Sequence, residues 1–166
     1  AMTALREKTP VSSIVTTWWP PGHFITCMGE RRVTFDGSTQ NTPQAYWVSN
    51  VFLEESERRA LGILRMLDTS ANGAVEYLEK KKLPLSQSVR FVRAIVPLGR
   101  ADAQKALGPL DLKGLTDLTH GTSAPPPAYL LVYNDEVETA LGLEFVARWN
   151  FRKAEALKAA VEKRPH

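Results

Sequence analysis

The sequence contains a single cysteine, Cys27, and no long hydrophobic run. One thiol excludes an internal disulfide and a cysteine-rich metal site. No stretch reaches the roughly 18 consecutive apolar residues that a transmembrane helix needs. No segment has the pattern of a secretory signal peptide. We therefore expect neither a disulfide-stabilised fold nor a membrane span within this sequence.

An excess of one charge is also lacking. The chain has 21 Lys and Arg against 18 Asp and Glu, which gives a net charge of +3. Basic residues are interleaved with acidic ones, as in 57–59 and 79–82. A nucleic-acid-binding protein concentrates its basic residues on one stripe or face. The charge pattern therefore predicts a solvated surface and no nucleic-acid partner.

The sequence has no phosphate-binding loop and no serine nucleophile elbow. Its three histidines, His23, His120 and His166, lie far apart. Spacing supports neither a metal site made of His23, Asp36 and His120 nor a nucleophile pair of Cys27 with a histidine. We expect no catalytic residue and no metal ligand in this chain, and we expect His23 to order the corner around it.

With 166 residues, of which 43% are hydrophobic, the chain predicts one domain over residues 1–166 with a single core. β-Branched and aromatic runs predict strands at 13–17 and 32–35 and a buried strand at 128–133. Strands so far apart, joined by helices, form a parallel or mixed sheet covered by helices. The predicted fold class is α/β, helix-rich, with a small sheet of three or four strands surrounded by helices.

Helical periodicity and stop signals predict most of the remaining chain. Residues 54–67 form the strongest pattern, and Glu54, Glu55 and Glu57 would occupy the first turn, where the helix dipole favours negative charge. We expect Ser86-Gln87-Ser88 to cap a helix that runs to Ile95. The further helices are predicted at 3–9, 71–82, 101–107, 112–119, 135–149 and 152–163, and the proline-rich segment 123–127 is predicted to be a loop.

The feature that points to function is Trp18-Trp19-Pro20-Pro21-Gly22. The prolines fix two φ angles and remove two backbone donors, so the segment should form a stiff corner. Adjacent residues of a strand point to opposite faces, which predicts one buried and one exposed indole. Exposed tryptophan on rigid backbone is typical of peptide- or glycan-binding surfaces. Packing of both rings in the core is the alternative interpretation.

The segment from Ser13 to His23 resembles the Trp-Trp-Asp-Tyr-Gly signature of the catalytic subunit of oligosaccharyltransferase, the membrane enzyme of asparagine-linked glycosylation. The resemblance continues in the same order along the chain. Residues 5–10 resemble the lead-in helix, 32–37 the next strand and acidic turn, 49–67 the following helix, and 127–132 a later core strand.

This resemblance implies that the chain is the extracytoplasmic C-terminal domain of a larger multi-pass membrane glycosyltransferase. In that family the membrane domain binds a divalent metal, Mn or Mg, and the lipid-linked oligosaccharide. The chain is therefore expected to carry no cofactor of its own, to hold the acceptor polypeptide, and not to catalyse transfer alone.

The resemblance assigns acceptor binding to Trp18 and Trp19, and by continuity to Pro20, Pro21, Gly22 and His23. Pro20 takes the place of the signature aspartate, whose carboxylate accepts a bond from the Ser or Thr of the acceptor. Proline has no side-chain acceptor, and losing such a bond removes roughly 1 to 3 kcal/mol of discrimination.

Weaker candidates for acceptor contact are Asp36, Asp135 and Val137. Three functions remain open from the sequence. The first is an oligosaccharyltransferase-like enzyme with altered Ser/Thr recognition, and the second is a divergent membrane glycosyltransferase with a different acceptor. The third is a non-enzymatic module that binds peptide or glycan on Trp18 and Trp19.

Overall fold

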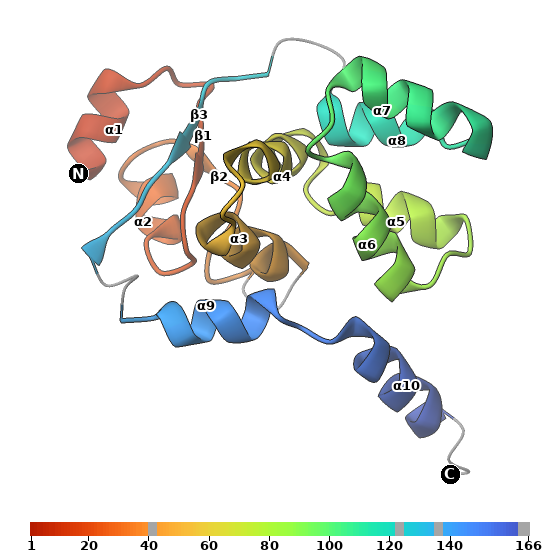
Figure 1. The fold of residues 1–166 in the computed structure, drawn as a ribbon. Coiled ribbons are helices and arrows are strands. Elements are labelled where there is room, and N and C mark those ends of the chain that lie inside the picture. The colour runs from red at the N-terminus through yellow and green to blue at the C-terminus, as the bar shows by residue number, and fades with distance from the viewer. Residues whose placement is uncertain (40–42, 122–124, 135–137, 163–166) are drawn as a thin grey trace.

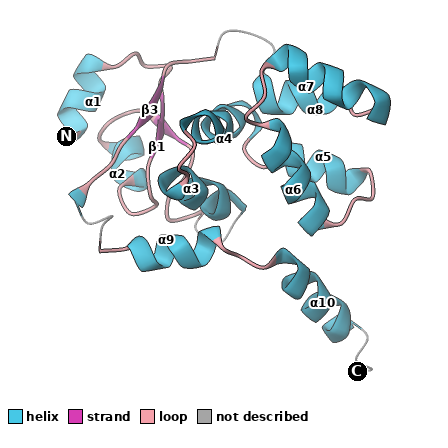
Figure 2. Ribbon diagram, viewed as in Figure 1, coloured by secondary structure: helices cyan, strands magenta, loops and turns pink. Residues whose placement is uncertain are grey.

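A computed structural model describes residues 1–39, 43–121, 125–134 and 138–162. Its three short strands form one sheet, and helices surround it (Figure 1; Figure 2). The strands are β1 (Ile14–Thr16), β2 (Arg32–Val33) and β3 (Ala128–Leu130). The helices are α1 (Met2–Lys8), α2 (Gly22–Cys27), α3 (Pro43–Leu53), α4 (Glu57–Ser70), α5 (Gly73–Lys80), α6 (Leu85–Ile95), α7 (Arg100–Leu107), α8 (Lys113–His120), α9 (Ala140–Ala147) and α10 (Phe151–Glu162), with a 3-10 turn η1 (Gly108–Leu110).

The sheet is parallel, with β1 between β2 and β3. In register, Ile14 lies beside Arg32 and Ala128, and Val15 beside Val33 and Tyr129. The predicted class is confirmed: a small parallel sheet surrounded by helices in a helix-rich chain. None of the described helices has the length and apolar content needed to cross a membrane.

The prediction of a buried strand at 128–133 was wrong in two respects. The strand is limited to β3, and all three of its residues are exposed, whereas all three residues of β1 are buried. The physical reason is position, because β1 has a neighbour on both sides and β3 is an edge strand with one. A run of apolar residues does not distinguish a central strand from an edge strand.

The helices divide the molecule into two parts. In Figure 1, α1 and α2 lie on one side of the strands and α3 and α4 on the other, while α5 to α8 pack together further away. Helix α4 contacts both α3 and α8 and so joins the two parts. Helix α9 packs on α3, and α10 contacts α6.

One core runs through both parts. It is built mainly from helix side chains, including the fully buried Trp47, Ile63 and Leu115. Trp18 and Phe35 belong to the same cluster, although they come from the segments that follow β1 and β2. The sheet end that carries the two tryptophans is therefore fixed to the helical core.

The predicted helix at 54–67 begins later, at Glu57, because Ser56 is the N-cap and accepts a bond from the backbone N–H of Arg59. Only Glu57 lies in the first turn. Glu54 instead precedes the helix and pairs with Arg59 at 2.8 Å and with Arg93 at 3.4 Å.

Helix α3 was not predicted as a separate element. It is buried on most of its surface, at Ala45 and from Trp47 through Val51. A helix covered on nearly every side lacks the polar face that makes periodicity visible. The sequence signal of an amphipathic helix is therefore weak where this helix lies.

Helices α1, α5, α7, α8 and α10 lie where they were predicted. The predicted cap at 86–88 was wrong. Helix α6 follows Pro84, and Ser86 lies in its first turn, where its N–H and hydroxyl donate to Glu155 of α10. Helix α9 runs over Ala140–Ala147 and is followed by α10 from Phe151, whereas the predicted start at residue 135 lies outside the described residues.

A buried arginine holds the N-terminal elements together. The Arg31 guanidinium donates to the carbonyls of Arg6 and Thr9 at 2.7 and 2.5 Å and to the Thr9 hydroxyl at 2.9 Å. It also donates to the carbonyls of Gly29 and Glu30. These bonds connect the end of α1 to the link between α2 and β2.

Candidate functional site

The two tryptophans follow β1 and have opposite environments. Trp18 is 7% exposed and Trp19 is 36% exposed. The prediction of one buried and one exposed indole is confirmed, and the alternative that both rings enter the core is wrong. Trp19 and its neighbours therefore form a surface feature that is attached to the core through Trp18.

Trp18 packs against Phe35, with ring centroids 5.1 Å apart and planes at 47°. Tilted aromatic pairs at this separation add attraction beyond the area they bury. Phe35 is itself 1% exposed. This pair joins the turn after β1 to the turn after β2 beneath the surface.

The backbone of the corner is closed by short-range hydrogen bonds. The Gly22 N–H donates to the Trp19 carbonyl at 3.1 Å, and the Ile25 N–H donates to the Pro21 carbonyl at 2.9 Å. Pro21 is the N-cap of α2, a helix that starts at Gly22 directly after the prolines. The stiff corner expected from the sequence thus continues into a helix turn that the sequence did not predict.

Gly22 has no room for a side chain. A Cβ atom at this position would lie 2.5 Å from the Cβ of Asp36 and 2.7 Å from the Phe35 carbonyl oxygen. The start of α2 therefore lies directly against the turn after β2. This close approach places Asp36, a weaker candidate from the sequence, next to the backbone that follows the two prolines.

Asp36 is held in a tight turn by Ser38 and Thr39. Its Oδ1 accepts from the N–H and hydroxyl of Ser38 at 2.9 and 2.6 Å, and from the N–H and hydroxyl of Thr39 at 3.2 Å each. The Ser38 hydroxyl bond is the main cause that lowers the pKa of the carboxyl below its ordinary value, against the opposing effect of burial. The carboxylate is therefore charged at neutral pH.

His23 and Gly37 complete the corner. The His23 Nδ1 lies 3.8 Å from Asp36 Oδ2, and the histidine side chain is 59% exposed while that of Asp36 is 18% exposed. A Cβ atom on Gly37 would lie 2.8 Å from His23 Nε2 and 3.7 Å from Trp19 Cε3. Sequence reasoning missed the roles of Gly37 and Phe35, although the Asp-Gly turn pair after a strand was a usable signal.

The structure thus brings together Trp18, Trp19, Gly22, His23 and Asp36. Pro20 and Pro21 lie at the same corner, partly exposed, and shape it without offering a polar side chain. Asp135 and Val137, the other weak candidates, lie outside the described residues. We name the surface formed by Trp19, His23, Asp36 and Gly37 the tryptophan corner.

The other residues considered for chemistry lie elsewhere. His120 ends α8, where its Nε2 is 3.0 Å from the Leu98 carbonyl oxygen, and burial lowers the pKa of its imidazole. Cys27 is exposed and free. Among the described residues, no three His, Cys, Asp or Glu side chains are grouped so that they could bind a metal ion.

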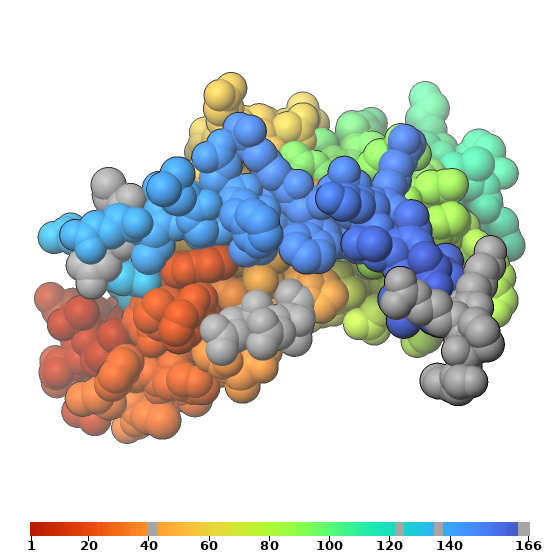
Figure 3. Space-filling view, turned by 90° about the horizontal axis from the view of Figure 1, so that it is seen from below, coloured from red at the N-terminus to blue at the C-terminus, as the bar shows by residue number. Residues whose placement is uncertain are grey.

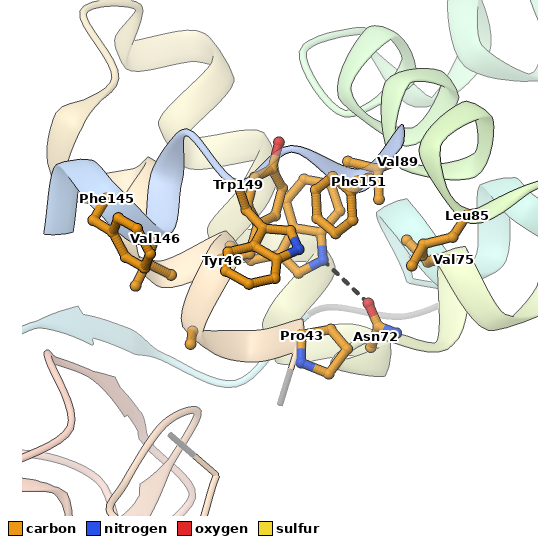
Figure 4. Close-up of a pocket in the computed structure, with 12 residues that line it drawn as sticks. Pro43, Tyr46, Asn72, Val75, Leu85, Val89, Phe145, Val146, Trp149 and Phe151 are labelled. Atoms are coloured by element: carbon orange, nitrogen blue, oxygen red, sulfur yellow. Dashed lines mark hydrogen bonds between the residues drawn. The ribbon is translucent and has the colours of Figure 1, made fainter. Parts of the chain in front are cut away.

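A concave region away from the tryptophan corner lies beneath α9 and the start of α10. It is an apolar cavity of about 430 Å³ between these segments and α3, α5 and α6. Figure 4 shows the rings of Tyr46, Trp149 and Phe151 on one side of it and Val75, Leu85 and Val89 on the other. The Trp47 indole donates to Asn72 Oδ1 at 3.2 Å in the wall of this cavity.

The outer face of α9 and α10 carries exposed apolar side chains next to the charged Glu144, Arg148 and Lys153. Phe145 and Trp149 are 67% and 48% exposed, with ring centroids 6.1 Å apart, and they border a groove of about 680 Å³ with Leu141 and Leu157. Figure 3 shows these helices running along one face of the molecule. The spacing of Phe145 and Trp149, four residues apart, was the sequence signal for this aromatic face.

Comparisons with known proteins identify relatives by sequence. No family model and no solved structure matches the chain. A dolichyl-phosphooligosaccharide-protein glycotransferase of Methanococcus voltae is 38% identical over 157 residues, which cover 89% of this chain and 17% of that protein. A protein of the same name from Methanocaldococcus jannaschii is 34% identical over the same shares.

The chain spans about a sixth of the length of these curated relatives. The alignments cover 89% of this chain and therefore include residues of both parts of the fold. The resemblance predicted from the Trp-Trp segment and its neighbours is confirmed, and the chain is homologous to a segment of the oligosaccharyltransferase family.

Proposed function

We propose that this chain is the acceptor-holding part of an oligosaccharyltransferase-like glycosyltransferase, and that the tryptophan corner binds the acceptor polypeptide. The observation that carries the proposal is the placement of Trp19, which is 36% exposed next to a backbone fixed by two prolines and by the buried Trp18–Phe35 pair. A large ring that is already immobilised loses little conformational freedom on binding. The names of the relatives supply the reaction class.

In this proposal, transfer takes place in a membrane domain outside the chain. That domain would bind the lipid-linked oligosaccharide donor together with a divalent metal, Mn or Mg. The chain would lie on the extracytoplasmic side of the membrane, where acceptor polypeptides emerge. Its contribution is to hold the acceptor segment so that the asparagine side chain reaches the donor, which lowers the entropic part of the barrier.

The proposal is tested in two steps. Peptides that contain Asn-Ala-Thr are titrated into the chain while tryptophan fluorescence is recorded, with Trp19→Ala and Phe145→Ala as matched variants. We expect saturable binding to the parent and to Phe145→Ala, and at least a tenfold weaker affinity for Trp19→Ala, as for an aromatic anchor. Equal binding to all three proteins would contradict the role of the corner.

The second step uses the longer protein that carries this segment, in membranes, with a lipid-linked oligosaccharide and the same peptides. Trp19→Ala should raise the KM for the peptide while the KM for the donor stays unchanged. Transfer by the intact protein separates the glycosyltransferase proposal from a module that only binds peptide or glycan. An unchanged KM for the peptide would exclude the corner as the acceptor site.

A further inference from the structure

We propose that the free edge of β3 binds the acceptor polypeptide as an added strand, next to the segment that lies on the tryptophan corner. The proposal rests on the proposed function of the corner and adds a second contact to it. The sheet has the order β2-β1-β3, so within the described part of the chain no strand pairs with the outer edge of β3. An edge of this kind can form main-chain hydrogen bonds with an extended peptide.

The pairing of β3 with β1 shows which backbone groups remain unpaired. The Leu131 N–H donates to the Thr16 carbonyl at 2.9 Å. Residues that bond to the same neighbouring strand alternate along a strand, so Tyr129 and Leu131 face β1. The N–H and carbonyl groups of Ala128 and Leu130 therefore point to the outer edge of the sheet.

The strand β3 lacks the features that protect most exposed strand edges. Natural edge strands carry charges, prolines or bulges that prevent pairing with another chain. The other edge strand, β2, has only two residues and carries the charged Arg32. In contrast, β3 contains neither a charge nor a proline, and Tyr129 and Leu130 are 38% and 45% exposed. Their side chains can pack against those of an added strand.

The unpaired groups define the chemistry of the partner. Two N–H and two carbonyl groups at alternate residues match the backbone of a second extended polypeptide, which offers the same groups at the same spacing. Main-chain bonds do not depend on the side chains of the ligand. Such a contact suits the acceptor of the proposed function, because that acceptor is a polypeptide.

The C-terminal end of β3 and the tryptophan corner lie at the same end of the sheet. The two parallel strands are in register at Thr16 and Leu130, and Trp18 follows Thr16 by two residues. Neighbouring strands lie about 4.8 Å apart, so an added strand would lie about 10 Å from β1. An extended chain covers this distance in about three residues. A peptide of roughly ten residues can therefore pack on Trp19 and pair with β3 at the same time.

The test compares a long peptide with a short one. In the long peptide, Asn-Ala-Thr is flanked by about five residues on each side, and the short peptide has about five residues in total and reaches only the corner. We expect the parent chain to bind the long peptide about tenfold more tightly, since two added main-chain bonds have about that combined effect. Equal affinities for the two peptides would contradict the proposal.

A proline substitution tests the edge directly. Leu130→Pro removes one outward N–H and leaves the residues that face β1 unchanged, and proline is tolerated on an edge strand where its nitrogen faces solvent. Leu130→Ala is the matched control, because it removes the side chain and keeps the N–H. Leu130→Pro should lower the affinity for the long peptide to about that for the short one. Equal binding of the long peptide by both variants would overturn the proposal.

Amide hydrogen exchange, followed by NMR, reports the pairing residue by residue. In the free chain, the N–H groups of Tyr129 and Leu131 should exchange more slowly than those of Ala128 and Leu130. When the long peptide is saturating, exchange at Ala128 and Leu130 should slow by about tenfold or more, since both groups become paired. Unchanged exchange at these two residues would show that the peptide does not add to the sheet.

Trp19→Ala separates this proposal from the function of the corner. If Trp19→Ala weakens both peptides while Leu130→Pro weakens neither, pairing with β3 is wrong and the function of the corner stands. If Trp19→Ala changes the affinity for neither peptide, the proposed function fails, and the proposal for β3 fails with it.

Misfolding of Leu130→Pro would be detected as a lower melting temperature. In that case the parent chain decides the question, with long peptides that are each N-methylated at one flanking residue. Methylation of every second residue should weaken binding, because the N–H groups of an added strand face β3 at alternate positions. Equal effects at all flanking positions would overturn the pairing.

Discussion

The molecule has two aromatic surfaces of opposite construction, the tryptophan corner and the face formed by Phe145 and Trp149. At the corner, the exposed ring of Trp19 follows a buried ring, and prolines, tight turns and close glycine contacts fix the backbone. On the other face, two exposed rings contact each other on the outside of α9 and the segment after it. One surface is anchored in the core, and the other is carried by a helix that packs on α3.

The comparison shows that exposure of an aromatic side chain does not identify a recognition site. Phe145 and Trp149 expose more of their surface than Trp19, and they border two concave regions of about 430 and 680 Å³. The charged side chains beside them, Glu144 and Arg148, form an exposed ion pair, whereas Asp36 beside Trp19 is 18% exposed and is held by hydrogen bonds from Ser38 and Thr39. A rigid ring next to an oriented carboxylate can select a ligand by shape and by hydrogen bonding, whereas an apolar face selects mainly by area.

The largest effect should come from removing the buried ring of the corner. Trp18→Ala should lower the free energy of unfolding by about 3 to 5 kcal/mol, since it creates a cavity against Phe35. Trp149→Ala removes a ring that is 48% exposed and should cost less than about 2 kcal/mol. Urea unfolding of both variants measures the difference, and equal losses would contradict the contrast between the two surfaces.

A glycine pair compares the backbones of the two regions. Gly22→Ala places a Cβ 2.5 Å from the Cβ of Asp36 and should destabilise the fold by about 1 to 3 kcal/mol. Gly142→Ala in α9 meets no atom within 4 Å, and alanine is the better helix former, so stability should stay equal or rise by up to about 1 kcal/mol. The melting temperatures of both variants measure the difference. An unchanged melting temperature for Gly22→Ala would mean that α2 does not contact the turn at Asp36 closely.

Acid should loosen both regions through different carboxylates. Hydrogen bonds from Ser38 lower the pKa of Asp36, and the backbone N–H of Ser86 is the main cause that lowers the pKa of Glu155. A pKa lowered by folding contributes stability that is present above the ordinary values of 3.8 and 4.5 and is lost as the pH falls through the folded-state pKa. The stability that these two carboxylates contribute should therefore be constant near neutral pH and be lost only below about pH 4.5.

Two variants assign this acid effect. Asp36→Asn should remove the loss of stability at acid pH that is accompanied by a change in Trp19 fluorescence. Glu155→Gln should remove the loss that is accompanied by release of α10 from α6. A His23→Gln background removes the other titratable group that faces Asp36. If the Trp19 fluorescence of Asp36→Asn still depends on pH in the same way, a group other than Asp36 is responsible for the acid effect at this turn.

The smallest effect on stability should come from the ring that is proposed to bind. Trp19→Ala should change the free energy of unfolding by less than about 1.5 kcal/mol, since the side chain is partly exposed and follows a turn that Trp18 holds in place. Denaturant unfolding measures this change. A loss as large as that of Trp18→Ala would place Trp19 in the core and contradict its role as a surface anchor.

The sequence predicted the features that depend on local pattern. The strands at Ile14 and Arg32, the opposite exposure of Trp18 and Trp19, and most of the helices follow from periodicity, proline positions and strand geometry. The family resemblance was also visible, because ordered matches along the chain remain although Pro20 and Pro21 replace two residues of the signature.

Features that depend on packing between distant segments could not be predicted in this way. Gly22 and Asp36 lie in two turns that are 14 residues apart in the sequence. Local sequence patterns do not show that these turns contact each other. Helix α3 lacks a polar face because other helices cover it, and β3 is exposed because it lies at the sheet edge. A charged residue such as Arg31 is usually exposed, and nothing in the sequence marks it as an exception. In the structure it is buried and donates five hydrogen bonds to neighbouring oxygens.

The most direct test of the account is to observe the indole N–H signals of Trp18, Trp19, Trp47 and Trp149 by two-dimensional NMR while an Asn-Ala-Thr peptide is added. Single Trp→Phe variants assign the four signals. The account predicts that the Trp19 signal shifts with saturation, that Trp18 shifts less, and that Trp47 and Trp149 stay in place. A shift confined to Trp149 would instead locate peptide binding on the face of α9 and contradict the role of the tryptophan corner.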